Sequence, residues 1–321
     1  MPNGCASMAN TVKLLLKARP TAAQLTDRLR APAPDGLELY LDTVDLATDA
    51  AMDDSVRALE EAGLLSDFVL LVEGPVRSLD GSFFETTRNS DADRELVRRL
   101  VALGSRIGAR AINLHLILPR LELAELTLAR REQALRACLP FTRYFVEQVG
   151  AAGIAASLEN MPPILRMRES RFYYSSIGMP AEDLAWLAEQ VPGLRLCLDV
   201  SHAQLYVNAC ALAQRPTLPR RYARFLAFVR QLPQAASVRQ YAADLGEALI
   251  TCHVANASGM LGEGRSYARG DLDIDAVAPY LATRARYFVT ETLERRQDRA
   301  TLMRDALRRL RRALGRSVGP G

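Results

Sequence analysis

Histidine and lysine are scarce in this chain of 321 residues. Only three histidines and two lysines are present, although lysine and arginine together number 41. The sequence also has no GxxxxGK[ST] loop, no GxGxxG after its first predicted strand, and no Ser-His-Asp set with nucleophile-elbow spacing. It therefore predicts neither a P-loop nucleotide site nor a nucleophile-elbow hydrolase, and it gives no support to a dinucleotide-binding sheet.

Long apolar runs and paired cysteines are missing as well. No run approaches the roughly 18 apolar residues of a membrane span, and residues 1–20 lack the basic start and apolar segment of a secretory signal. The five cysteines form no CxxC pair and no zinc-ribbon spacing: Cys5, Cys138, Cys197, Cys210 and Cys252. We expect a cytoplasmic protein without membrane contact or disulfides, in which Cys197 and Cys252 are buried in strands.

The composition is that of a globular protein with a mild positive charge. Hydrophobic residues make up 49% and charged residues 24%, and the net charge is +4. This charge does not by itself indicate nucleic-acid binding, and we interpret the basic stretch at 308–316 as the solvated face of a last helix. We expect a small-molecule partner, and the sequence leaves a homo-oligomer open.

Short apolar runs alternate with amphipathic segments along the whole chain. The predicted strands are residues 12–17, 36–42, 67–73, 110–116, 153–159, 194–200, 247–254 and 286–293. Eight strand–helix units predict an α/β protein with a single (β/α)8 TIM barrel over residues 1–321; a doubly wound open sheet is the alternative. Residues 1–10 are expected to form a flexible tail. Residues 203–246 are expected to form a helical insertion over the catalytic face, as a lid or an oligomer contact.

Ionisable side chains gather at the ends of the later strands. They are Glu73, His115, Glu159, Asp199 with His202 just after it, His253 and Glu291. The carboxyl ends of barrel strands build the active site, and carboxylates this close repel one another unless a cation neutralises them. The pattern predicts an enzyme with one divalent metal ion; Mn²⁺, Mg²⁺ or Co²⁺ are favoured, with Zn²⁺ or Fe²⁺ as alternatives.

Several of these residues stand in motifs that follow one another in a familiar order. The motifs are SLEN at 157–160, CLDVSHA at 197–203, CHVANASG at 252–259, GEG at 262–264 and TETLE at 290–294. Together they resemble the xylose isomerase-like TIM-barrel superfamily. This superfamily includes sugar isomerases and epimerases, inosose dehydratases and endonuclease IV-type AP endonucleases.

The resemblance to the epimerase members implies a role for each site residue. It implies that Glu159, Asp199, His253 and Glu291 hold one metal ion and that His202 binds substrate oxygens. Glu159 and Glu291 would be the acid–base pair that moves a proton next to the substrate carbonyl. The function predicted in this way is a metal-dependent isomerase or epimerase of a sugar or related polyhydroxy carbonyl compound. An inosose-type dehydratase, a lyase that uses the same site, is the alternative.

The nuclease branch fits the sequence less well. Resemblance to it implies three zinc ions, a histidine where this chain has Glu73, and an Asp-x-His within residues 260–271, where this chain has no histidine. An endonuclease IV-like phosphodiesterase is therefore the weaker alternative, and nucleic acid is not the expected partner. His115 matches the nuclease histidine of the fourth strand, so a second metal held by His115 and Glu159 stays open.

The remaining site candidates have structural as well as functional interpretations. His115, Asn160 and Arg265 are candidate substrate-binding residues, and Glu38 and Glu73 are weaker site candidates. Asn160 could equally orient Glu159 or cap the following turn. Residues 262–275 are either a glycine-rich turn before an Asp-capped helix or a mobile substrate loop that uses Arg265 or Arg269.

Overall fold

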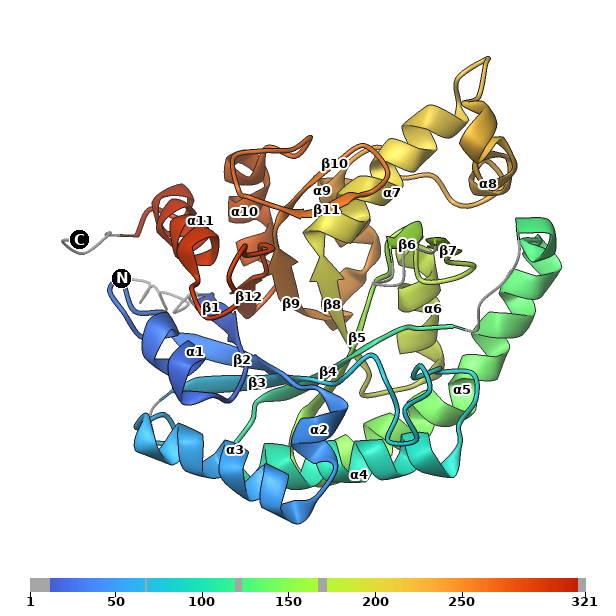
Figure 1. Ribbon diagram of the computed structural model, residues 1–321. Helices are drawn as coiled ribbons and strands as arrows, with labels where there is room; N and C mark the ends of the chain where they lie inside the picture. Colours follow the sequence, from blue (N-terminus) through green and yellow to red (C-terminus); the bar gives the residue numbers. More distant parts are fainter. Residues whose placement is uncertain (1–11, 67, 119–122, 167–171, 317–321) are drawn as a thin grey trace, which may run out of the picture.

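Eight parallel strands close into a barrel in the computed structural model, which describes residues 12–66, 68–118, 123–166 and 172–316 (Figure 1). The strands are β1 (Lys13–Ala18), β2 (Gly36–Tyr40), β3 (Val69–Glu73), β4 (Ala111–His115), β5 (Ala155–Glu159), β8 (Arg195–Asp199), β9 (Leu249–Val254) and β12 (Tyr287–Thr290). Their order around the barrel is β1-β12-β9-β8-β5-β4-β3-β2, and β1 pairs with β2 to close it. The predicted TIM barrel is confirmed, and all eight strands overlap the predicted ranges.

Helices cover the outside of the barrel. They are α1 (Ala22–Arg28), α2 (Thr43–Leu46), α3 (Asp49–Glu61), α4 (Asp91–Arg106), α5 (Leu128–Ala151), α6 (Ala181–Gln190), α7 (Val200–Ala213), α8 (Ala223–Val229), α9 (Val238–Asp244), α10 (Ile274–Ala282) and α11 (Thr301–Ala313), with short 3₁₀ turns η1 (Leu123–Glu125), η2 (Arg220–Tyr222) and η3 (Gly246–Ala248). The last helix, α11, buries Met303, Ala306, Leu307 and Leu310. Its arginines stay at least partly exposed, as the basic stretch predicted.

The inside of the barrel is layered, and the layers explain where the polar residues lie. A small apolar cluster fills the interior: Leu15, Leu71, Ala111, Ile250 and Val289. Side chains two positions apart on a strand share a face. Lys17, Glu73, Asn113 and Glu291 each follow a member of this cluster by two residues. The apolar cluster therefore forms the base on which a polar layer stands at the carboxyl ends of the strands.

The segment 203–246 carries more helix than the other connections. It contains most of α7, then α8 and α9; α9 packs against α6, α7 and α10 in the outer layer, and Figure 1 shows α8 standing away from the barrel. The helices of the predicted insertion are thus present, and their role as a lid stays a prediction. Residues 1–10, the predicted tail, lie outside the described residues.

Two antiparallel hairpins that the sequence did not predict follow the strand ends. β6 (Ile164–Arg166) pairs with β7 (Phe172–Tyr174) after β5, and β10 (Asn256–Ser258) pairs with β11 (Gly262–Arg265) after β9. The Asp-capped helix after residue 262 is confirmed, because the Asp273 side chain accepts a hydrogen bond from the Ala276 amide at the start of α10. Both hairpins therefore follow the carboxyl ends of barrel strands, β5 and β9.

Among the described residues, no helix has the length and apolar character needed to cross a membrane. Four cysteines, Cys138, Cys197, Cys210 and Cys252, are buried free thiols, while Cys5 lies outside the described ranges.

Candidate metal centre and substrate cavity

Four potential metal ligands converge at the carboxyl end of the barrel. They are Glu159 at the end of β5, Asp199 at the end of β8, His253 on β9 and Glu291 just after β12. One ligand atom from each lies within 4.8 Å of the others. These are the four residues that the sequence resemblance implied, and the fold brings them together from strands up to 132 positions apart in the chain.

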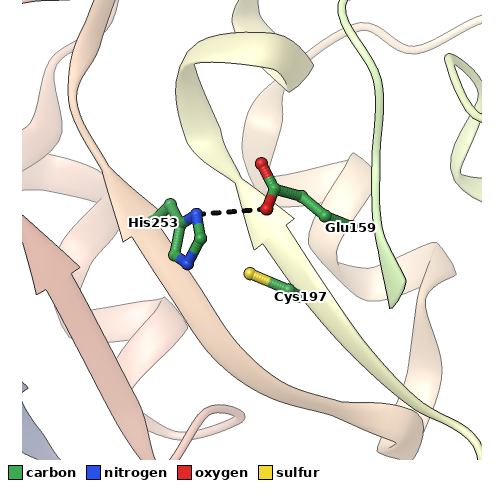
Figure 2. Close-up of side chains that lie close together, drawn as sticks. All are labelled: Glu159, Cys197 and His253. Atoms are coloured by element: carbon green, nitrogen blue, oxygen red, sulfur yellow. Dashed lines mark ion pairs between the residues drawn. The ribbon is translucent and has the colours of Figure 1, made fainter. Parts of the chain in front are cut away.

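His253 is the centre of this cluster and is fully buried. Its Nδ1 lies 3.3 Å from Glu159, as Figure 2 shows, and 2.7 Å from Glu291, while its Nε2 lies 2.9 Å from a carboxylate oxygen of Glu38. Neither ring nitrogen has a hydrogen-bond partner among the described residues, so Nδ1 faces two carboxylates and Nε2 faces a third. This is the orientation that a histidine ligand takes, with a carboxylate behind its other nitrogen.

The groups around His253 favour a positive charge at its position. Burial alone lowers the pKa of His253, but the Cys197 sulfur and three neighbouring carboxylates raise that pKa well above its usual value. Without a metal ion, the imidazolium supplies positive charge among the glutamates. A divalent ion held by Glu159, Asp199, His253 and Glu291 would supply that charge instead, so the donor set fits a metal.

Glu159 is held ionised at the floor of the site. The Asn113 amide donates a 2.7 Å hydrogen bond to its Oε2, and rings of His115 and His202 lie 3.8 and 3.7 Å away. Burial raises the pKa of Glu159, but the surrounding histidines outweigh it and hold the pKa well below its ordinary range. Asn113 is a site residue that the sequence interpretation missed.

Cys197 lies beside this group, as Figure 2 shows. Its sulfur is within 4.8 Å of ligand atoms of Glu159 and His253. Burial raises the pKa of the Cys197 thiol well above its usual value, so it is a neutral, poorly ligating group. Cys197 is better explained as the small buried side chain that the sequence predicted.

Lys17 is the most important residue that sequence reasoning missed. It lies on β1 and is 5% exposed, and its ammonium group contacts the carboxylates of Glu73 and Glu291, with Glu38 at 4.0 Å. Burial lowers the pKa of Lys17, but these carboxylates outweigh it and raise the pKa well above its usual value. The signal was present in the sequence, since Lys17 is one of only two lysines in an arginine-rich chain and lies inside an apolar strand.

Glu291 shares in the same interactions and stays charged. Burial raises its pKa, but Lys17 and His253 lower the pKa to about 2. At neutral pH its carboxylate is therefore ionised, the form that both ligates a metal and accepts a proton.

Asp199, Asn160 and His202 form a connected unit where β8 runs into α7. Asp199 caps α7 by accepting a 2.7 Å hydrogen bond from the His202 amide, and burial raises the pKa of Asp199 to about 6. The Asn160 side chain accepts a hydrogen bond from the Asp199 amide (2.7 Å) and donates one to the Asp199 carbonyl (3.1 Å). Asn160 therefore positions Asp199, which favours a structural role over the predicted substrate contact.

A cavity of about 350 Å³ opens above the cluster. Its polar lining includes His115, Asp199, His202 and Glu291, whereas Glu159 and His253, which cluster with Asp199 and Glu291, are not among its lining residues. Ser201 and Glu263 also line it, and Glu263 lies 3.7 Å from His202. Arg265 is exposed on β11 and does not line this cavity. The structure thus places His115 and His202 in the lining of the cavity and Arg265 outside it, and the substrate contacts of all three stay predictions.

Comparison with known proteins gives a likeness in structure only. No protein-family profile and no curated protein matches the chain. A D-tagatose 3-epimerase-like protein matches 95% of the chain over 98% of its own length, with 14% identity and a TM-score of 0.63. A 3-keto-D-glucoside 4-epimerase from E. coli matches 94% over 99% of its length, with 14% identity and a TM-score of 0.64.

The chain shares its barrel fold with these proteins, and this is the fold that the resemblance to the xylose isomerase-like superfamily implied. Endonuclease IV from Thermus thermophilus also matches, with 16% identity, a TM-score of 0.51 and coverage of 94% of the chain and 99% of its own length. Structures named for sugar epimerases and for a nuclease therefore share this architecture.

Proposed function

We propose that the protein is a divalent-metal-dependent isomerase or epimerase of a polyhydroxy carbonyl compound. The observation that carries the proposal is the pairing of His253 Nδ1 with Glu159 and Glu291, in a cluster that Asp199 completes. Two structural neighbours bear the names of sugar epimerases, which supports the same class of substrate.

The chain's own residues would divide the chemistry between them. A divalent ion held by Glu159, Asp199, His253 and Glu291 would polarise a substrate carbonyl and the neighbouring hydroxyl. This would acidify the C–H of the α-carbon, which bears that hydroxyl. Glu291 lines the cavity and is ionised, so it is placed to remove that proton. We assign the return of a proton to Glu159. Glu159 lies on β5, which β8 separates from β9 in the barrel.

Other residues would hold the substrate and balance the charge. His202 and His115 line the cavity and can bind substrate oxygens. Lys17 stays protonated beside Glu291 and keeps that carboxylate in place for the reaction. Asn160 fixes Asp199 through its two backbone groups.

The described residues offer less to a three-metal nuclease. A second cluster of Glu73, His115 and Glu159 has ligand atoms within 4.8 Å of one another. However, Glu73 already contacts the Lys17 ammonium, and burial raises the pKa of Glu73 well above its usual value despite that cation. A second metal ion at this cluster would compete with the Lys17 ammonium for Glu73.

Metal analysis combined with proton exchange tests the proposal. We expect about one divalent ion per chain in the purified full-length protein, lost in Glu159→Gln and His253→Asn. His115→Asn is the matched histidine control and keeps the ion, because His115 is not one of the four ligands. The metal-loaded protein should incorporate solvent deuterium into ketohexoses or 3-keto-glucosides.

Other outcomes would contradict the proposal. Loss of water from an inosose without isomerisation would assign a dehydratase. Three bound zinc ions with cleavage of abasic DNA would assign a nuclease. A folded protein that binds no divalent ion would overturn every version of this chemistry.

A further inference from the structure

The lining of the cavity has an ionisable part and an apolar part, which we call its floor and its wall. The floor comprises Glu85, His115, Asp199, His202, Glu263 and Glu291, whereas the wall comprises Val76, Phe83, Ile117, Leu118, Met161, Leu165, Tyr173 and Leu293. These apolar residues come from the segments that follow β3, β4, β5 and β12. The cavity volume of about 350 Å³ lies within the roughly 300–1,000 Å³ of small-molecule sites.

Part of this wall is exposed to solvent. Among the described residues four large hydrophobic side chains are exposed: Val44 (65%), Val76 (43%), Leu128 (45%) and Leu293 (66%). Two of the four, Val76 and Leu293, line this one cavity. Exposed apolar side chains gathered at a concave site mark a surface that a ligand covers.

Leu293 is held in its exposed position by the backbone around it. Its amide donates a 3.0 Å hydrogen bond to the Gly264 carbonyl, and the Gly264 amide in turn donates to the Ser201 hydroxyl at 3.1 Å. A Cβ at position 264 would lie 2.5 Å from Leu293 Cγ, so the leucine packs directly on the glycine. The fold therefore presents this side chain at the cavity rather than leaving it loose.

On the other part of the wall, two aromatic rings lie close to each other. The ring centroids of Phe83 and Tyr173 are 6.4 Å apart with the planes tilted by 55°, and Arg77 lies over the Phe83 ring. Such faces bind flat or branched apolar groups well. Hydroxyl groups placed against them would lose their water without gaining hydrogen bonds, which costs free energy.

We propose that the substrate is amphipathic, with a polyhydroxy carbonyl part on the charged floor and an apolar substituent of about aryl size against this wall. The inference rests on the proposed function for the polar part and on the wall residues for the apolar part. A keto-glycoside with an aromatic or branched apolar aglycone has this chemistry. A free ketohexose, which carries oxygen on every carbon, does not.

A matched pair of probes tests the inference. Calorimetry on the metal-loaded full chain compares phenyl 3-keto-β-D-glucopyranoside with its methyl counterpart. We expect the phenyl glycoside to bind on the order of tenfold to a hundredfold more tightly, because the wall buries its ring. Leu293→Ser and Phe83→Ser should reduce this preference, while Leu128→Ser, the same change at an exposed leucine outside the cavity, should leave it unchanged.

The outcomes separate this inference from the proposed function. Phenyl-selective binding that falls in the wall variants supports the inference whether or not deuterium exchange is seen. Equal binding of the two glycosides, binding of neither, or a preference that survives both wall variants overturns it. Deuterium exchange into free ketoses without any phenyl preference would support the proposed isomerase and overturn the amphipathic substrate.

Discussion

His253 Nδ1 lies 2.7 Å from Glu291 Oε2, and neither atom has a hydrogen-bond partner among the described residues. Buried polar atoms without such partners are costly, so their occurrence together indicates a group that the chain itself does not supply. A metal ion held by both residues would remove this cost. Glu291 is also one of the three carboxylates that, with Cys197, raise the pKa of His253.

A divalent metal should therefore stabilise the fold. At a metal concentration about 100 times the dissociation constant, we expect the free energy of unfolding to rise by about 2.7 kcal/mol. Chemical denaturation with and without Mn²⁺ after chelation measures this rise. Glu291→Gln should lose most of it, because the amide replaces a ligand of the cluster. An unchanged unfolding midpoint in the wild-type protein would contradict the prediction.

Lys17 should contribute strongly to stability when no metal is bound. Lys17→Met leaves Glu73 and Glu291 facing each other without their shared cation, and breaking a buried ion pair of this kind costs about 3–5 kcal/mol. The loss should be smaller in saturating metal, since the ion neutralises Glu291. Urea unfolding in both conditions measures the two values.

The other lysine provides the control for this variant. Lys13 lies on the same strand and is exposed, so Lys13→Met should change the free energy of unfolding by no more than about 0.5 kcal/mol. If Lys17→Met were as mild as Lys13→Met with no metal bound, the charge balance described for the site would be wrong.

The sequence predicted the barrel from local pattern, and the resemblance to the epimerases selected the four residues that the fold brings together. Apolar runs of strand length specify the barrel, and carboxyl ends of parallel strands meet at one edge whatever the connections between them. The place of Lys17 in the site was not predicted, because a lysine in a strand is ordinarily at the surface. Its burial follows from the position of Leu15, two residues earlier, in the apolar cluster inside the barrel.

Side-chain direction in the connecting segments could not be predicted in the same way. Arg265 lies on a hairpin whose register with β10 is irregular, and no period in the sequence indicates which face of it meets the cavity. Asn160 could not be assigned either, because its two hydrogen bonds to Asp199 join residues 39 positions apart in the chain. The apolar wall of the cavity is likewise assembled from four separate segments.

Asp27 should make stability depend on pH at a place far from the metal cluster. Its carboxylate on α1 accepts hydrogen bonds of 2.7 Å from the Ala300 amide and from Arg304, which tie the first helix to the last. Burial raises the pKa of Asp27, but these hydrogen bonds outweigh it and lower the pKa below 3.8. The native state therefore favours the ionised form.

It follows that the contribution of Asp27 is complete above pH 3.8, the ordinary pKa of aspartate, and is lost as the pH falls through the lower native pKa. Asp27→Asn should cost about 2 kcal/mol at pH 7, and the difference from wild type should shrink as the pH falls below 3.8. Asp54→Asn, at an exposed surface pair, is the control and should cost little at any pH. A difference that grows on acidification would have the wrong sign.

Gly264 should be required for the shape of the cavity mouth. It has a φ of +64° and its missing side chain makes room for Leu293, whose Cγ would lie 2.5 Å from an added Cβ. Gly264→Ala should therefore cost about 1 kcal/mol for the backbone conformation and about 1–3 kcal/mol more for the displaced leucine. Gly259→Ala isolates the first cost, since Gly259 has a φ of +60° with nothing within 4 Å of its added Cβ.

Urea unfolding of the two variants gives the difference between their costs. Gly264→Ala should also weaken binding of the phenyl glycoside, whereas Gly259→Ala should not. Equal costs in the two variants would show that Leu293 moves aside freely and is not held at the cavity by the glycine.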